Sequence, residues 1–356
     1  MDAVIRILAI GLAFGLTVFV HELGHFLSAR LAGMVVYEFS IGFGRPLLFW
    51  FKRGDTQYSF RLWPFFSYVR IAGMEADDDH PQGFGKKRRS AQAIVLCMGS
   101  VMNFLLAVGI FVVMGTTIGR AVSENRIDQV MDKSPAKEAG LLAGDWIVGA
   151  NGKATRSVAT IREVITGSPG KLVVLDIERG GKRQAVPITP RAETEYDVRG
   201  LKARKVSVGR IGIVFAYHLQ PMGVGESVKD GFLFIYDMVH VQIAGLVGML
   251  QKTVPAEFIG PVGMAGMLYS QAKAGWSGFL WTFALFTTAI CFLNLLPIPP
   301  LDGSRLAILA VEGIRGKPFD QKKVFVLHLV GLALFLGLAV IIAYKDIIRL
   351  LAQKSP

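Results

Sequence analysis

The segment His21-Glu22-Leu23-Gly24-His25 has residue types and spacing that suit metal-dependent hydrolysis. On a helix, positions i and i+4 share a face, so His21 and His25 can offer both imidazoles to one metal ion while Glu22 flanks it. Zinc accepts such ligands in tetrahedral geometry, and a catalytic site keeps one position for water. The metal lowers the pKa of that water to about 7, and the glutamate takes its proton as it attacks a carbonyl. Two histidines that merely pack or hydrogen-bond are the alternative interpretation.

The surroundings of this segment strengthen the metal interpretation. Residues 7–20 contain no charge, and as a helix they climb about 20 Å at roughly 1.5 Å per residue. His21 therefore follows a stretch long enough to lie deep in a bilayer. Ionisable groups at that depth cost several kcal/mol or more, so they indicate function.

Composition indicates an integral membrane protein with room for one extra domain. The chain has 356 residues, of which 52% are hydrophobic, and a mean hydropathy of +0.45, which is more apolar than a soluble protein. The net charge of +12 comes from loops that flank apolar segments, which favours a membrane over nucleic acid as the partner. Cys97 and Cys291 both lie in apolar segments, so neither a disulfide framework nor a cysteine zinc site is expected.

Four apolar segments are predicted to cross the membrane. They cover residues 4–29, 90–119, 275–301 and 324–344. The loops after the first and third segments are rich in lysine and arginine and are therefore cytoplasmic, which leaves both termini and the long middle segment outside. Residues 231–250 are also apolar, but charged residues at near-helical spacing favour an amphipathic helix along the interface.

This topology brings a third metal ligand to the histidines. The first and third spans run in the same direction, so Asp302, after the third span, reaches the same depth as His21 and His25. A carboxylate supplies the ligand that two histidines lack. Pro297 and its neighbouring prolines interrupt the helix, which a membrane tolerates only against a cavity or other protein. A helix N-cap at the membrane surface is the alternative for Asp302.

Two separated motifs carry a family resemblance. HELGH at 21–25 and NLLPIPPLDG at 294–303, with four spans around an outer insert, resemble the site-2 protease family of intramembrane zinc metalloproteases. The likeness is to the bacterial regulator-of-sigma-E protease type, here with a single PDZ domain. It implies His21, His25 and Asp302 as zinc ligands, Glu22 as catalytic base, and Asn294 and Pro297 as substrate-binding residues. Asn294 would hold substrate backbone or help to stabilise the oxyanion.

The cytoplasmic loop contains two candidate substrate-binding features. Residues 40–46 resemble the family's glycine-containing membrane-associated loop, which implies substrate contacts for Gly42, Phe43 and Gly44, although a plain turn is the alternative. Residues 58–64 and 68–71 alternate apolar and polar side chains, which predicts two strands joined by a turn. In the family such a membrane-associated β-hairpin can pair with an unwound substrate; an ordinary surface hairpin is the alternative.

The outer insert resembles an α+β PDZ domain. Residues 134–145 match the helix and turn of protease-associated PDZ domains, and residues 171–177 and 184–188 read as a hairpin. Such a domain can capture a peptide end by strand addition, or it can act as a size filter above the active site. The expected divisions are 1–119 with two spans, 120–192 as the PDZ domain, 193–274 as a linker with the interfacial helix, and 275–356 with the last two spans.

The sequence therefore predicts a polytopic α-helical membrane protein that cleaves transmembrane segments with zinc. The resemblance implies substrates such as pre-cleaved anti-sigma factors and remnant signal peptides, a bacterial inner membrane location, and an active site near the cytoplasmic side. The alternative is a non-catalytic scaffold with a PDZ domain and a structural metal. Glu22 discriminates between them, because a structural site needs no base beside an open coordination position. An ion transporter is disfavoured by the absence of repeats.

Overall fold

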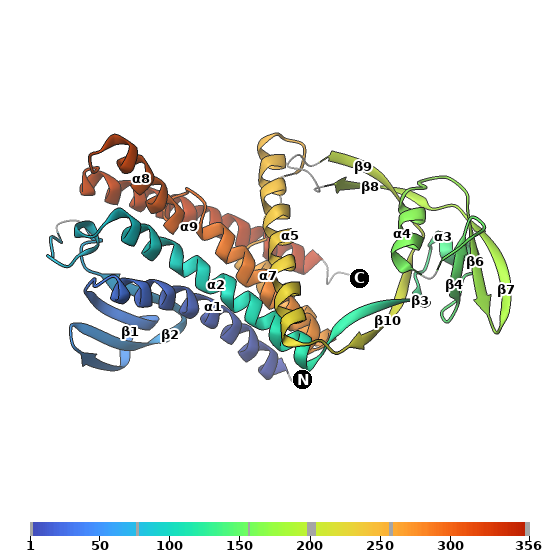
Figure 1. The fold of residues 1–356 in the computed structure, drawn as a ribbon, viewed down its shortest axis with the longest axis horizontal. Helices are drawn as coiled ribbons and strands as arrows, with labels where there is room; N and C mark the ends of the chain where they lie inside the picture. Colours follow the sequence, from blue (N-terminus) through green and yellow to red (C-terminus); the bar gives the residue numbers. More distant parts are fainter. Residues whose placement is uncertain (1–2, 76–77, 156, 198–203, 256–258, 353–356) are drawn as a thin grey trace. The chain divides into compact units, whose positions relative to one another are not determined.

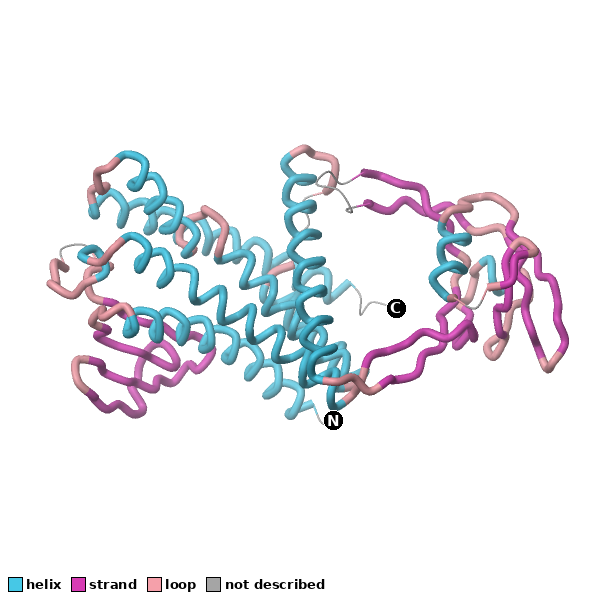
Figure 2. Tube along the Cα trace, in the orientation of Figure 1, coloured by secondary structure: helices cyan, strands magenta, loops and turns pink. Residues whose placement is uncertain are grey.

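The computed structural model describes residues 3–75, 78–155, 157–197, 204–255 and 259–352. The chain forms two compact units, each with its own internal contacts. The first comprises Met1–Val113, Val228–Val239 and Glu257–Pro356, and the second Met114–Ser227 and His240–Ala256. The first is built mainly from helices and the second mainly from strands (Figures 1 and 2).

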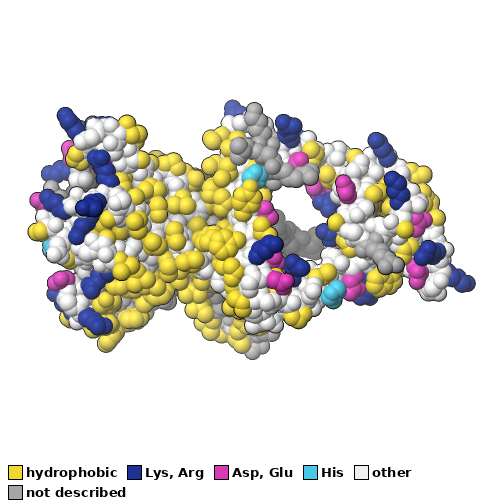
Figure 3. Space-filling view, in the orientation of Figure 1, with side chains coloured by type: hydrophobic (Ala, Val, Ile, Leu, Met, Phe, Trp, Pro, Cys, Tyr) yellow, Lys and Arg dark blue, Asp and Glu magenta, His cyan; other side chains and the backbone are white. Residues whose placement is uncertain are grey.

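Long helices dominate the first unit. The helices that contribute to it are α1 (Ala3–Leu31), the short η1 (Phe84–Lys86), α2 (Arg89–Thr117), α5 (Val224–Leu250), α6 (Pro261–Ala274), α7 (Trp276–Asn294), α8 (Asp302–Arg315) and α9 (Gln321–Ala352). Hydrophobic side chains cover the outside of this helical part, and lysine and arginine gather beyond the helix ends near α8 (Figure 3). This distribution is the one expected of helices that face lipid.

Five of the described helices are long and apolar enough to cross a membrane, namely α1, α2, α5, α7 and α9. Four of them lie where the sequence predicts spans. The fifth, α5, also meets the length and composition criterion, although the sequence favours an interfacial helix there. The count of four spans therefore stays a prediction. Helix α7 ends at Asn294, earlier than the predicted limit of 301, because the prolines that follow cannot continue it.

Helices α1 and α7 run parallel in the helical unit. The Phe14 and Phe286 ring centroids are 4.4 Å apart, and the hydroxyls of Thr17 and Thr287, further along both helices, lie 2.8 Å apart. The buried residues of α1 recur at spacings of three and four, so one face of the helix packs against its neighbours. Both histidines lie on this face.

The sheet between α1 and α2 along the chain differs from the predicted hairpin. Strand β1 (Val36–Arg53) pairs with β2 (Thr56–Ile71), and residues 36–41 contact both halves of β2, with Phe39 opposite Val69 on one side and Tyr58 on the other. The two predicted strands are therefore not neighbours, and their direct pairing was wrong. A period-two pattern identifies strands but not their partners. Gly42 and Gly44 have φ of 94° and 80°, conformations that favour glycine, and interrupt the regular register inside β1.

The second unit contains an antiparallel sheet with two helices. Its elements are β3 (Arg120–Val130), α3 (Pro135–Glu138), β4 (Trp146–Ala150), β5 (Lys153–Ala154), α4 (Val158–Thr166), β6 (Val173–Arg179), β7 (Lys182–Ile188), β8 (Arg191–Asp197), β9 (Arg204–Arg210) and β10 (Ile213–Gln220). The strand order is β10-β3-β4-β6-β7, with β5 on β4, while β8 and β9 pair separately. Apolar side chains from α3, α4 and the sheet form one core.

Two features of this unit bear on the sequence predictions. The predicted hairpin is present as β6 and β7, which turn at Gly180 and Gly181. Strand β10 pairs with β3, although it follows residue 192, where the sequence sets the end of the PDZ domain. In the sequence, the hairpin β8–β9 lies between β10 and the other strands of this sheet. A domain boundary set from local motifs is therefore placed before β10.

Candidate metal centre

Helix α2 approaches α1 closely at the histidines because two glycines remove side chains from the contact. A Cβ atom at Gly24 would strike the Met98 backbone, with its carbonyl carbon 2.7 Å away. A Cβ at Gly99 would lie 2.6 Å from Cε1 and 2.8 Å from Nε2 of His21, and it would also strike His25. The two imidazoles are thus held in a narrow space between the helices. No local pattern in the sequence identifies Gly99 as part of this site.

Asp302 reaches the histidines from the first turn of α8. The chain leaves α7 at Asn294, turns through the proline-containing segment and starts α8 at Asp302. A Cβ at Gly303 would strike the backbone of Leu295 and Leu296, so only glycine lets α8 begin this close to the preceding turn. This contact fixes the position of the Asp302 carboxylate.

Three ligand atoms converge at one point. Oδ2 of Asp302 lies 3.0 Å from Nε2 of His21 and 3.2 Å from Nε2 of His25, and the two nitrogens are 3.1 Å apart. Both histidines are buried. This triangle has a circumradius of about 1.8 Å, so a point roughly 1 Å off its plane is about 2.0–2.1 Å from all three atoms, the usual zinc–ligand distance. The donor set therefore fits zinc in both chemistry and spacing.

The His25 ring is oriented for a metal on Nε2. Its Nδ1–H donates to the carbonyl of Val95, at 2.7 Å, and a carbonyl can only accept. In the neutral ring this bond leaves the lone pair on Nε2, directed at His21 and Asp302. Metal-ligating histidines commonly donate their second N–H to such a carbonyl, which fixes the tautomer.

Glu22 lies beside this cluster. It occupies the α1 position between the two histidines, and the charges of His21, His25 and Asp302 act on its carboxylate. Val69 of β2 packs with Phe26 and Ala29 of the same helix, which places the β1–β2 sheet beside the centre. A carboxylate in this position can exchange a proton with a molecule bound at the cluster.

The other predicted site residues are not part of the cluster. Asn294 is half-buried at the end of α7, and Pro297 is exposed in the turn that follows. The Asn294 side chain makes no hydrogen bond to another described residue. Gly42, Phe43 and Gly44 belong to β1, and the side chain of Phe43 lies outside the described structure.

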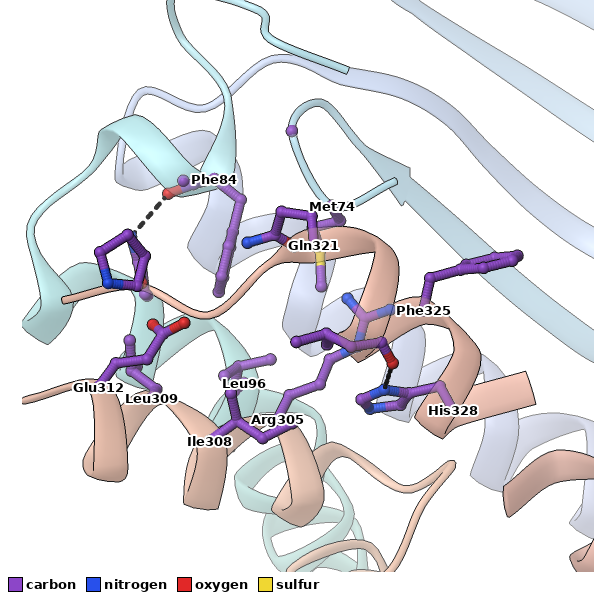
Figure 4. Close-up of a pocket in the computed structure, with 15 residues that line it drawn as sticks. Met74, Phe84, Leu96, Arg305, Ile308, Leu309, Glu312, Gln321, Phe325 and His328 are labelled. Carbon is purple, nitrogen blue, oxygen red and sulfur yellow. Dashed lines mark hydrogen bonds between the residues drawn. The ribbon is translucent and has the colours of Figure 1, made fainter. Parts of the chain in front are cut away.

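A cavity of about 150 Å³ adjoins α8 on the side lined by Met74, Phe84, Arg305 and His328, which Figure 4 labels. Burial lowers the pKa of the Arg305 guanidinium below its ordinary value, while the nearby Asp302 charge acts in the opposite direction. His328 is outside the metal cluster, because its Nε2 lies 3.0 Å from Oγ of Ser304 and its Nδ1 donates to a carbonyl of its own helix. These contacts tie α9 to the first turn of α8.

The cluster has the donor set of a metallopeptidase centre and lies among helices long enough to span a membrane. Residues 9–338 match the model of Peptidase family M50, and the chain belongs to this family. The site-2 protease resemblance and the prediction of a peptidase are thereby confirmed.

Individual relatives cover nearly the whole chain. A protein from Clostridium perfringens is 31% identical over 339 residues, which are 95% of this chain and 97% of that relative. Zinc metalloprotease RasP of Geobacillus kaustophilus is 27% identical over 414 residues, covering 94% and 96%. Regulator of sigma-W protease RasP of Bacillus subtilis is 28% identical over 426 residues, covering 97% and 98%. A solved PDZ domain of the SdrC-like protein from Listeria monocytogenes is 25% identical, with a TM-score of 0.21, over 28% of this chain and 94% of that one.

Proposed function

We propose that the protein is an intramembrane zinc endopeptidase in which His21, His25 and Asp302 hold zinc and Glu22 is the catalytic base. The observation that carries this proposal is the convergence of the three ligand atoms beside Glu22 in a chain of peptidase family M50. Bound zinc acts as a Lewis acid and makes water acidic enough to lose a proton near neutral pH. The Glu22 carboxylate takes that proton and returns it to the nitrogen of the leaving peptide fragment.

A transmembrane substrate must be unwound before it is cut, since a helix engages its own carbonyls in hydrogen bonds. Residues 67–71 of β2 pair with residues 36–41 on one side. Val69 in this segment packs with Phe26 and Ala29 of α1, the helix that carries Glu22. We assign this sheet edge to strand addition by the unwound substrate, because main-chain pairing tolerates many sequences.

Three further features would complete the substrate site. Gly42, Phe43 and Gly44 lie in the irregular part of β1, where glycine permits close approach of another backbone. Asn294 has an amide that can hold substrate backbone or the developing oxyanion. Pro297 lies in the turn that follows Asn294, where the backbone is no longer helical. The family resemblance supports these roles.

The proposed topology has four crossings, with the metal centre toward the cytoplasmic side of a bacterial inner membrane. The parallel direction of α1 and α7 supports it. If α2 and α5 both crossed with no return through α6, α7 would run antiparallel to α1. The basic residues of the loop that precedes α2 support its cytoplasmic location.

The substrates that we propose are membrane proteins with a single shortened outer segment. One relative is named a regulator of sigma-W protease, which supports membrane-anchored anti-sigma factors as a substrate class. Remnant signal peptides present the same chemistry, an apolar helix with little outer structure.

The PDZ-like part of the second unit is the proposed substrate-selecting domain, formed by residues 120–192 together with β10. A groove of about 620 Å³ lies between α4 and β10 and is lined by Arg162, Ile165 and Phe215, among others. Strand β10 is at the edge of the sheet. An edge strand beside a groove favours capture of an extended peptide by strand addition.

The test is the position of the cut. The purified enzyme would be reconstituted with a single-span model substrate, and the product ends would be identified by mass spectrometry, with and without a zinc chelator. We expect cleavage inside the apolar segment that stops with the chelator and returns with zinc. Cleavage only outside the segment, or no cleavage of any single-span substrate by zinc-loaded protein, would favour the scaffold alternative.

A further inference from the structure

Asn103 is a fully buried amide on α2 that faces the His21 ring. Its side chain is 0% exposed, and its Nδ2 lies 3.5 Å from Nδ1 of His21. In this orientation its Oδ1 has no hydrogen-bond partner. An acceptor that is buried without a partner is unfavourable.

Rotation of the amide by 180° exchanges the positions of Oδ1 and Nδ2 and brings the unpaired acceptor to His21. The oxygen and nitrogen of an asparagine side chain have nearly the same shape, so the rotation needs no other movement. It places Oδ1 where Nδ2 lies, about 3.5 Å from Nδ1 of His21. There the oxygen can accept a hydrogen bond from Nδ1–H of His21, while Nδ2 takes the former position of Oδ1.

The rotated orientation matches what a zinc ligand requires. His21 points Nε2 at Asp302 and His25, so a neutral His21 that binds metal must carry its proton on Nδ1. The Val95 carbonyl accepts the corresponding hydrogen bond from Nδ1–H of His25. Gly99 and Asn103 are four residues apart and share a face of α2. Helix α2 thus leaves room for the His21 ring at Gly99 and places the Asn103 amide beside Nδ1 of that ring.

We infer that Asn103 is a positioning residue that holds the proton of His21 on Nδ1 and keeps the Nε2 lone pair directed into the metal site. It acts on the metal through His21 and touches neither metal nor substrate. The inference rests on the proposed zinc site. A polar residue in an otherwise apolar span is the sequence signal that could have identified Asn103.

The test compares zinc affinity among three variants of the full-length protein. Asn103→Leu removes the acceptor at comparable size, Asn103→Asp keeps an oxygen acceptor, and Ser100→Ala changes another buried polar residue of α2 whose Oγ also has no partner. Each protein would be purified in detergent, stripped of metal and titrated with zinc against a competing chelator. Circular dichroism of the metal-free proteins would establish that they fold.

We expect Asn103→Leu to bind zinc about 10–100-fold more weakly, the usual effect of losing a partner of a ligating histidine. Asn103→Asp and Ser100→Ala should bind like the wild type or, for the aspartate, more tightly. Equal affinity of Asn103→Leu and wild type would overturn the inference, as would a loss in Asn103→Asp equal to that in the leucine variant. If the leucine variant does not fold, Asn103→Ala carries the same expectation. A wild type that binds no zinc would instead refute the metal site itself.

Discussion

Gly99→Ala should weaken zinc binding because it adds one methyl group directly against both histidine rings. The new Cβ would lie 2.6 Å from Cε1 of His21, whereas ordinary contact begins at 3.4 Å, so ring and helix must separate by about 0.8 Å. Metal–ligand distances tolerate only about 0.2 Å. Overpacking of this kind costs about 1–3 kcal/mol. If that cost falls on the metal-bound geometry, zinc affinity drops by about 5–150-fold.

The matched control is Gly109→Ala on the same helix. A Cβ at Gly109 meets nothing within 4 Å, so this change should leave zinc affinity unaltered and, if anything, stabilise α2 by about 0.5–1 kcal/mol. Chelator competition would give the affinity of each purified variant, and thermal unfolding its stability. Zinc binding by Gly99→Ala that equals the control would refute the close packing of α2 on the metal centre.

Three further predictions follow from the same contacts. Gly303→Ala should reduce zinc affinity and cleavage at least tenfold, because a methyl group would push α8 off the preceding turn. The control Gly313→Ala in the same helix should have no effect, because its added Cβ meets only Arg89 Nη1 at 3.9 Å. Asp302→Ala should lower the zinc content per purified chain measured by atomic spectrometry; unchanged stoichiometry would remove Asp302 from the ligand set. In the second unit, burial raises the pKa of Asp145, but hydrogen bonds from Arg179 and the Leu142 backbone outweigh it and hold that pKa below its ordinary value. The stability from this pair is therefore present above about pH 4 and is lost as pH falls through the lowered pKa. Asp145→Asn should remove that pH dependence, measured by hydrogen exchange of β4 and β6. The variant should also destabilise the unit by about 3 kcal/mol, the low end for a broken buried pair because Arg179 is partly exposed.

The three residues of the candidate metal site could be predicted from sequence because each has a local signal. His21 and His25 are spaced for one helix face, and Asp302 becomes their partner once the first and third spans are given the same direction. The basic loops supply that direction. The structure brings these three residues together.

The supporting residues had no comparable signal. Gly99 matters only because α2 crosses α1 at the histidines. The central position of residues 36–41 in the β1–β2 sheet also depends on pairing across the chain, which alternation of side chains does not encode. Strand β10 joins the sheet of the second unit only after β8 and β9 have intervened in the sequence, so no local motif identifies it as part of that sheet.

The central claim is that the cluster catalyses hydrolysis with Glu22 as its base. The most direct measurement compares Glu22→Gln with the wild type on one transmembrane substrate, with zinc determined in both samples. The account predicts equal zinc content and a cleavage rate reduced by about 10²–10⁴-fold in the variant, the contribution typical of a general base. A zinc-loaded Glu22→Gln enzyme that cleaves at the wild-type rate would contradict it.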